Sequence, residues 1–266
     1  MMLLLDLGNS RVKWALAAQY PAAWLAHGAL GWDEDISAQL ALAWAQYPPL
    51  QAVVAASVVD AARESQVAAA AAERFGHAPR WLRTPASACG VRNAYAEPQR
   101  LGVDRFLAMV AAHAAGHAPC VLASAGTALA LDALAGDGDH LGGLIAPGVQ
   151  LMQRSLGIAT VHARADHPGA IVDVARNTTD AVTSGCWHAM AALVERFVQR
   201  MTPALGGAPT LVLGGGDAVR LLPLLTLPAQ VMADGVLHGL ARWAVTDGMV
   251  APATECAGAS QRAGGP

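Results

Sequence analysis

Several polar and charged residues lie together near the start of the chain, in a pattern suited to binding a phosphate group and a metal ion. Asp6 ends an apolar run, and Gly8, Asn9, Ser10 and Lys13 follow it closely. A carboxylate can bind Mg²⁺ directly or through water, and amide, hydroxyl and backbone N–H groups donate to phosphate oxygens. Gly8 lets the backbone come close to a ligand, and Lys13, the only lysine in the chain, is a compact charge suited to a phosphate. The stretch predicts a phosphate loop, with a structural turn as the alternative because Asp-x-Gly-Asn is also common turn chemistry.

A second candidate residue follows a long connection, over residues 83–102, that is rich in Pro, Gly, Asn and Arg. Connections of this length are usually functional or disordered. Asp104 lies just after it, at the start of a predicted helix, where the helix macrodipole favours an ionised carboxylate. Such a residue could accept a proton from a substrate. The alternative is a helix N-cap, a role that Asp commonly fills.

The elements that hold these residues can be predicted from the apolar periodicity. In the first half we expect strands over 3–7, 14–17, 24–30, 51–58 and 80–82. We expect helices over 33–45, 61–75 and 104–115, with Gly76 ending the second of them. In the second half we expect a hairpin over 120–132 and strands over 140–145, 210–213 and 229–232. We expect helices over 149–156, 178–200 and 235–246, and a short helix from 217 onwards after a glycine turn. Thr178 or Thr179 is the predicted cap of the long helix.

The hairpin over 120–132 repeats the opening pattern, with Ser124 in the place of Asp6 and Gly126 in the place of Gly8. The chain therefore resembles one strand-rich α/β unit used twice. We expect one domain over 1–116, a second over 117–248 and a frayed tail over 249–266, which is rich in Ala, Gly, Pro and Ser. Two such units facing each other would bring both polar turns into one cleft, where a nucleotide phosphate tail could lie between them.

Composition narrows the class of protein and its partners. The chain has 266 residues, 54% of them apolar and 14% charged, so we expect one large or two modest domains with a sizeable core. The formal net charge is −3 and there is no basic stripe, so nucleic acid is a poor candidate partner. Four scattered cysteines and no secretion signal favour a reducing cytoplasm. No apolar window reaches the length of a membrane span, so no membrane partner is expected.

Five motifs together resemble a known family. They are Asp6 to Ser10, the Y-x-x-P-x-x-L-G-x-D-R run from Tyr95 to Arg105, Ser124 to Ala128 as a D-x-G-T-A variant, the G-G-x-I-x-P-G run from Gly142 to Gly148, and the glycine turn from Gly214 to Gly216. In combination they are similar to type III pantothenate kinases, the Bvg accessory factor family of the acetate kinase, sugar kinase, Hsp70 and actin superfold. The likeness runs from Asp6 to about residue 246, and the run from Tyr95 to Arg105 is its most specific part.

The resemblance implies an α/β fold of duplicated ribonuclease H-like (actin-like ATPase) domains with a nucleotide cleft between them. It implies ATP-dependent phosphorylation of pantothenate to 4′-phosphopantothenate, the first step of coenzyme A biosynthesis, by direct in-line transfer in a cytoplasmic homodimer. Asp104 would be the general base, and Asp6 would hold Mg²⁺ through water. The residues implied for the ATP phosphates are Asp6, Leu7, Gly8, Asn9, Ser10, Arg11, Val12, Lys13 and Thr127, and those for pantothenate are Tyr95, Gly102, Val103, Asp104, Arg105 and Thr178.

Each of these residues also has an ordinary structural interpretation. Arg105 could form a surface ion pair, Tyr95 could be a half-buried core aromatic, and Thr178 could be a helix N-cap. Gly214 to Gly216 would make room for adenosine, or they form a plain strand-to-helix turn.

Ser124 departs from the family's pattern, which usually has Asp at this position as part of a site for K⁺ or NH₄⁺. A serine hydroxyl is a neutral, weak ligand, so either the monovalent-cation site is altered or another group, such as Asp132, supplies the charge. Two rival hypotheses stay open, and Ser124 favours the first of them. One is a nucleotide-responsive regulatory or scaffolding protein with weakened catalysis, and the other is a related small-molecule kinase or phosphatase of the same superfold.

Overall fold

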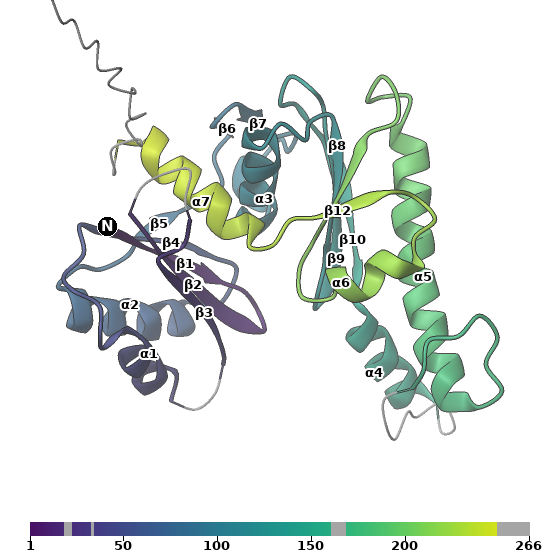
Figure 1. The fold of residues 1–266 in the computed structure, drawn as a ribbon, viewed down its shortest axis with the longest axis horizontal. Coiled ribbons are helices and arrows are strands. Elements are labelled where there is room, and N and C mark those ends of the chain that lie inside the picture. The colour runs from purple at the N-terminus through teal and green to yellow at the C-terminus, as the bar shows by residue number, and fades with distance from the viewer. Residues whose placement is uncertain (19–22, 33–34, 161–168, 249–266) are drawn as a thin grey trace, which may run out of the picture.

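Two five-stranded sheets with the same strand order form the framework of the chain (Figure 1). The computed structural model describes residues 1–18, 23–32, 35–160 and 169–248, so the predicted tail over 249–266 lies outside the described residues. In each sheet an antiparallel meander of three strands is extended by two parallel strands on the far side of its first strand. The predicted duplication of one α/β unit is therefore confirmed.

The first sheet has the order β3-β2-β1-β4-β5. Its strands are β1 (Met2–Leu7), β2 (Arg11–Ala17), β3 (Ala26–Gly31), β4 (Ala52–Ser57) and β5 (Arg80–Leu82). Successive side chains of β1 point to opposite faces. Leu3, Leu5 and Leu7 pack against two helices, α1 (Ile36–Trp44) and α2 (Ala61–Phe75). Asp35 and Asp60 cap these helices, and Gly76 ends α2 in the left-handed region at a φ of 76°.

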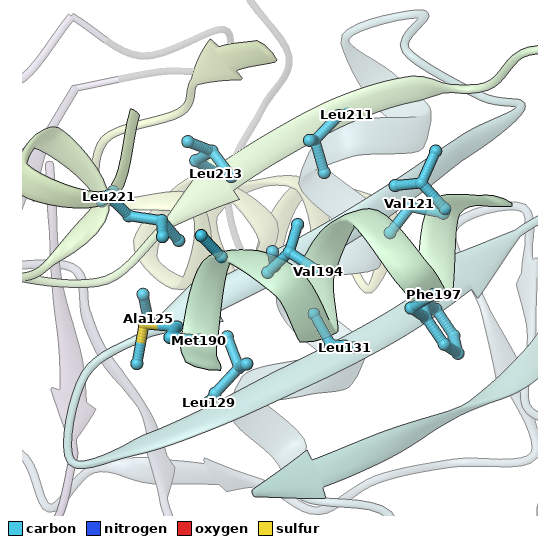
Figure 2. Close-up of a cluster of buried hydrophobic side chains, with 14 of the residues drawn as sticks. Val121, Ala125, Leu129, Leu131, Met190, Val194, Phe197, Leu211, Leu213 and Leu221 are labelled. Atoms are coloured by element: carbon cyan, nitrogen blue, oxygen red, sulfur yellow. The ribbon is translucent and has the colours of Figure 1, made fainter. Parts of the chain in front are cut away.

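The second sheet has the order β10-β9-β8-β11-β12. Its strands are β8 (Cys120–Ala125), β9 (Ala128–Leu134), β10 (His140–Pro147), β11 (Thr210–Gly214) and β12 (Ala229–Val231). The long helix α5 (Thr178–Met201) covers one face. Figure 2 shows Met190, Val194 and Phe197 of this helix pointing at the strands, where they meet side chains of β8, β9 and β11. The helix α4 (Val149–Ala159) connects β10 to the segment before α5, and α6 (Ala218–Leu221) with the 3-10 turn η2 (Leu222–Leu224) follows β11.

Two helices fill the space between the sheets, α3 (Val103–Ala114) and α7 (Gly235–Thr246) (Figure 1). α7, the last helix of the described chain, packs on the first sheet, where Leu237 and Leu240 contact Met2 and Leu4. α3 lays Phe106, Met109 and Val110 against Cys120 and Leu122 of the second sheet. The layers are thus α1 and α2, first sheet, α7 and α3, second sheet, α5. The first sheet is covered partly by α7, which follows the predicted domain boundary at 116 and 117, and the second sheet partly by α3, which precedes it. The domain boundary stays a prediction.

Most of the predicted elements are present within two or three residues of their expected bounds. The long connection over 83–102 contains a small hairpin of β6 (Ser87–Ala88) and β7 (Val91–Arg92) and the 3-10 turn η1 (Pro98–Arg100). One expectation was wrong: the long helix is capped by Asn177, whose side chain accepts the backbone N–H of Asp180 at 2.9 Å, and not by either threonine. Among the described residues, none of the helices is long and apolar enough to cross a membrane.

Candidate active site

The two polar turns meet between the sheets. The hydroxyl groups of Ser10 and Thr127, which are 117 residues apart in sequence, lie 2.6 Å from each other. The first turn is closed by Gly8 N–H donating to the Arg11 carbonyl at 3.0 Å. Trp32 Nε1 donates to the Gly8 carbonyl at 2.7 Å and so fixes this turn from the side. The predicted juxtaposition of the two turns is confirmed.

The second turn is built from close backbone approaches. Gly148 N–H donates to the Thr127 carbonyl at 3.0 Å, and a Cβ at Gly148 would overlap the Gly126 carbonyl. The glycine turn after β11 packs against the same place, because a Cβ at Gly215 (φ +85°) would overlap the Ala125 carbonyl. The structure therefore brings the glycine turn to the end of β8, beside the second polar turn.

The charges of three carboxylates and one ammonium group influence one another at the first turn. The pKa of Asp6 is raised to about 7. Burial and the negative charges of Asp104 and Asp234 raise it, and the positive charge of Lys13 opposes them. Lys13 Nζ lies 3.4 Å from Asp234 Oδ1. This excess of negative charge is an environment that favours a divalent cation. No three His, Cys, Asp or Glu side chains of the described chain are close enough to bind a metal ion on their own. The cluster therefore fits Mg²⁺ held by Asp6 with help from water and phosphate oxygens.

Asp234 is not among the residues predicted from the sequence for this site. It lies at the N-cap position of α7 in the left-handed region (φ 50°), and its carboxylate makes no capping hydrogen bond. A non-glycine residue with positive φ is uncommon. Its position just after a strand end was the available signal, but Lys13 and Asp234 are 221 positions apart in the sequence, and this separation concealed the contact.

Asp104 lies in the first turn of α3, and Gly102 occupies the N-cap position without a side-chain cap. The alternative of Asp104 as the helix cap is therefore wrong. Burial raises the pKa of Asp104 above its ordinary value, against the effect of the Arg105 backbone N–H, which donates to Asp104 Oδ1 at 2.8 Å. A partly buried carboxylate with a raised pKa is a better proton acceptor at neutral pH than an exposed one.

Gly102 leaves the space in which the Asp104 carboxylate lies, because a Cβ at this position would be 2.5 Å from Asp104 Oδ1. We expect Gly102→Ala to displace the carboxylate and to lower kcat by about 10²-fold, since misplacement of a reacting group by about 1 Å can have that effect. Steady-state kinetics of phosphoryl transfer will measure this. Gly185→Ala, an α5 position where a Cβ meets nothing within 4 Å, is the matched control. Unchanged kcat in Gly102→Ala would show that the carboxylate position does not matter.

The other predicted residues divide into three groups. Leu7, Val12 and Val103 have side chains buried in the cores, so they can reach a ligand only through their backbone. Arg105 is also buried, pairs with Asp132 and donates to the Tyr95 hydroxyl, so the surface ion-pair alternative is wrong. Asn9, Ser10 and Arg11 are exposed at the first turn, with Gly8 and Lys13 partly buried beside them.

Thr178 is the first residue of α5 and is exposed. Because Asn177 is the cap, the capping interpretation of Thr178 is wrong. The first turn of α5 lies beside α4, at the far end of the second sheet from α3 (Figure 1). Within one chain, the structure does not bring Thr178 to Asp104, and its substrate role stays a prediction.

Ser124 lies on β8 opposite Ala130 of β9, beside Gly214. Asp132 does not supply the missing charge there. Its Oδ1 accepts from Arg105 and His140, and its Oδ2 accepts from Arg105. Ser124 itself therefore offers only a neutral hydroxyl, and the charge of Asp132 is matched by Arg105.

A cavity of about 610 Å³ lies elsewhere, between α5, β11 and the segment before β12. None of its lining residues belongs to the turns or to the Asp104 region. The candidate site is thus defined by the chemistry at the meeting of the two turns and not by this cavity.

Solved structures with a similar fold define the class. A Sinorhizobium meliloti protein described as a 2-dehydro-3-deoxygalactonokinase superposes with a TM-score of 0.62 at 15% identity, covering 93% of this chain and 99% of that one. A Campylobacter jejuni protein described as a Baf family transcriptional activator gives a TM-score of 0.59 at 17% identity, covering 92% and 98%. The chain therefore has the duplicated actin-like α/β fold, with its two polar turns facing each other.

Sequence comparison then defines the family. The model of the type III pantothenate kinase family matches residues 2–200. Type III pantothenate kinases of Aromatoleum aromaticum and Xanthomonas oryzae are 41% and 43% identical over 241 and 245 residues, each covering 91% of this chain and 96% of the relative. The chain belongs to the type III pantothenate kinase family.

Proposed function

We propose that this protein transfers the γ-phosphoryl group of ATP to the primary hydroxyl group of pantothenate and so forms 4′-phosphopantothenate for coenzyme A biosynthesis. Membership of the family supports the substrate. The observation that carries the proposal is electrostatic and geometric. The Ser10 and Thr127 hydroxyls lie 2.6 Å apart, so two polar turns face each other. The charge of the partly buried Asp104 carboxylate raises the pKa of Asp6, in accord with a base that acts at the same site.

Phosphoryl transfer needs positioning, charge neutralisation and a proton acceptor. The backbone of residues 8–13, Lys13 and the hydroxyls of Ser10 and Thr127 bind the phosphates from two sides. Asp104 accepts the proton of the substrate hydroxyl as its oxygen attacks phosphorus. Asp6 would hold Mg²⁺ through water, and the bound ion would neutralise charge on the phosphate oxygens.

The proposed pantothenate pocket is formed by Tyr95, Gly102 and Arg105 beside Asp104. We further propose a homodimer. β10 is the edge strand of its sheet, and Ile145 on it is 65% exposed, while Ile158 on neighbouring α4 is 86% exposed. Exposed apolar surface of this kind commonly marks an interface. A cytoplasmic setting accords with the free thiols of Cys89, Cys120 and Cys186.

The test is transfer of radiolabelled phosphate from ATP to pantothenate by the purified protein, with light scattering on the same sample for the dimer. Labelled 4′-phosphopantothenate supports the proposal. A product with another alcohol but none with pantothenate would favour a different kinase of the superfold. Nucleotide binding without any product would favour a regulatory protein, the alternative that Ser124 suggests.

Monovalent cations provide a separate prediction. Because Ser124 is neutral and Asp132 is engaged by Arg105 and His140, we expect the rate to change by less than about twofold when K⁺ is replaced by Na⁺, since ligand charge largely sets cation affinity. Ser124→Asp should introduce a K⁺ dependence. Initial rates over a K⁺ titration measure both. A parent enzyme that is inactive without K⁺ contradicts the expectation.

A further inference from the structure

A buried polar network joins the substrate side of the site to the second sheet. Arg105 Nε and Nη2 donate to the two oxygens of Asp132 at 2.9 and 2.6 Å. His140 Nε2 lies 2.9 Å from Asp132 Oδ1. Arg105, Asp132 and His140 are 7%, 3% and 4% exposed, so water competes little with these bonds.

The hydrogen bonds of the network have a defined direction. The Ala94 backbone N–H points at His140 Nδ1 at 3.5 Å, which assigns Nδ1 as the acceptor and Nε2 as the donor to Asp132. Arg105 Nη1 lies 3.1 Å from the Tyr95 hydroxyl. A guanidinium group only donates, so the Tyr95 oxygen accepts this bond and its own O–H remains directed elsewhere. The Tyr95 ring also stacks on His140, with centroids 6.1 Å apart at 17°.

Stability alone does not account for this arrangement. A buried ion pair is often no more stabilising than well-packed apolar residues of similar size. Gly143 leaves room both for the adjacent strand and for this network. A Cβ at this position would overlap the Leu131 carbonyl and would also lie 2.7 Å from both Arg105 Nη2 and Asp132 Oδ1. Asp132 lies on β9, which begins directly after Thr127, and His140 begins β10. The network therefore links a strand of the phosphate turn to the residue next to Asp104.

We propose that Asp132 and His140 are positioning residues for pantothenate. They hold Arg105 against the Tyr95 hydroxyl, and the hydroxyl then donates a hydrogen bond to an acceptor oxygen of the substrate. The inference rests on the proposed function. In this proposal, Arg105 acts mainly by orienting Tyr95 and not by binding the substrate carboxylate. Two variants separate this from a structural role. In His140→Gln the amide N–H can take the place of Nε2, whereas in His140→Asn it is too short to reach Asp132.

The experiment measures kcat and both KM values for the parent, His140→Gln and His140→Asn. We expect the Asn variant to raise the KM for pantothenate by about fivefold to tenfold, the range for one lost hydrogen bond. The Gln variant should stay within about twofold of the parent, and the KM for ATP should be unchanged in both. His188→Asn on α5, where the imidazole contacts the Val172 carbonyl, is the matched control.

A double-variant cycle tests whether the effect passes through Tyr95. His140→Asn should add less than about twofold to the KM of Tyr95→Phe, because residues that act through one contact are not additive. Full additivity, equal rises in both KM values, or no difference between the Gln and Asn variants overturns the proposal. If His140→Asn does not fold, His140→Phe, which keeps the ring and loses the donor, replaces it. Failure of both to fold would mean a purely structural network. A parent that makes no phosphopantothenate refutes the proposed function instead.

Discussion

Asp104→Asn is expected to lower kcat for phosphorylation of pantothenate by about 10²- to 10⁴-fold, the usual contribution of a general base. The amide has nearly the shape of the carboxylate and can still accept the Arg105 backbone N–H, so the first turn of α3 should be preserved. It cannot accept the proton of the attacking hydroxyl. ATP binding should persist, because the phosphates are held by the two turns.

The measurement is single-turnover transfer from labelled ATP, with nucleotide affinity determined by calorimetry on the same protein. Asp60→Asn is the matched control, since it alters a carboxylate at the N-cap of another helix, a position where Asn serves equally well. Substantial transfer by Asp104→Asn, within about tenfold of the parent, would exclude Asp104 as the base. Loss of nucleotide binding along with transfer would indicate a structural role.

Asp6→Asn is expected to impair catalysis and to stabilise the fold. A carboxylate that holds a metal through water typically contributes about 10- to 100-fold to metal affinity or activity. We therefore expect the Mg²⁺ concentration for half-maximal rate to rise by about that factor. Ser124 offers no second carboxylate at the facing turn, so little of this loss should be compensated.

The stability change follows from the pKa of about 7 at Asp6. Because this pKa is above that of an unfolded Asp, the ionised carboxylate destabilises the folded state. Its cost appears as the pH rises above about 4 and is complete above pH 7. One pKa unit corresponds to about 1.4 kcal/mol, so Asp6→Asn should raise the free energy of unfolding by roughly 1–4 kcal/mol at pH 8. The gain should vanish near pH 4. Urea denaturation at both pH values measures this, and a variant less stable than the parent at pH 8 contradicts it.

Local sequence patterns predicted the strands and one helix end of this chain correctly, but they did not predict the cap of α5. Short continuous apolar runs in Met2–Leu7 and Cys120–Ala125 predicted buried strands because such a run is a property of neighbouring residues. Gly76 at the end of α2 was predictable for the same reason. The cap of α5 was assigned wrongly because Asn177, Thr178 and Thr179 are all good caps, and only the path of the preceding backbone selects one.

The sequence alone therefore determined the duplicated α/β elements, the two polar turns and the candidate base Asp104. The tertiary structure decided which groups interact. It put Ser10 against Thr127, brought Asp234 to Lys13, and engaged Asp132 with Arg105 and His140, so that it does not replace the carboxylate missing at Ser124. It also raised the pKa of Asp6 through burial and the charge of Asp104. The reason is physical: periodicity and turn chemistry act between neighbours in the chain, whereas burial and electrostatic coupling depend on how two sheets and the helices between them face each other.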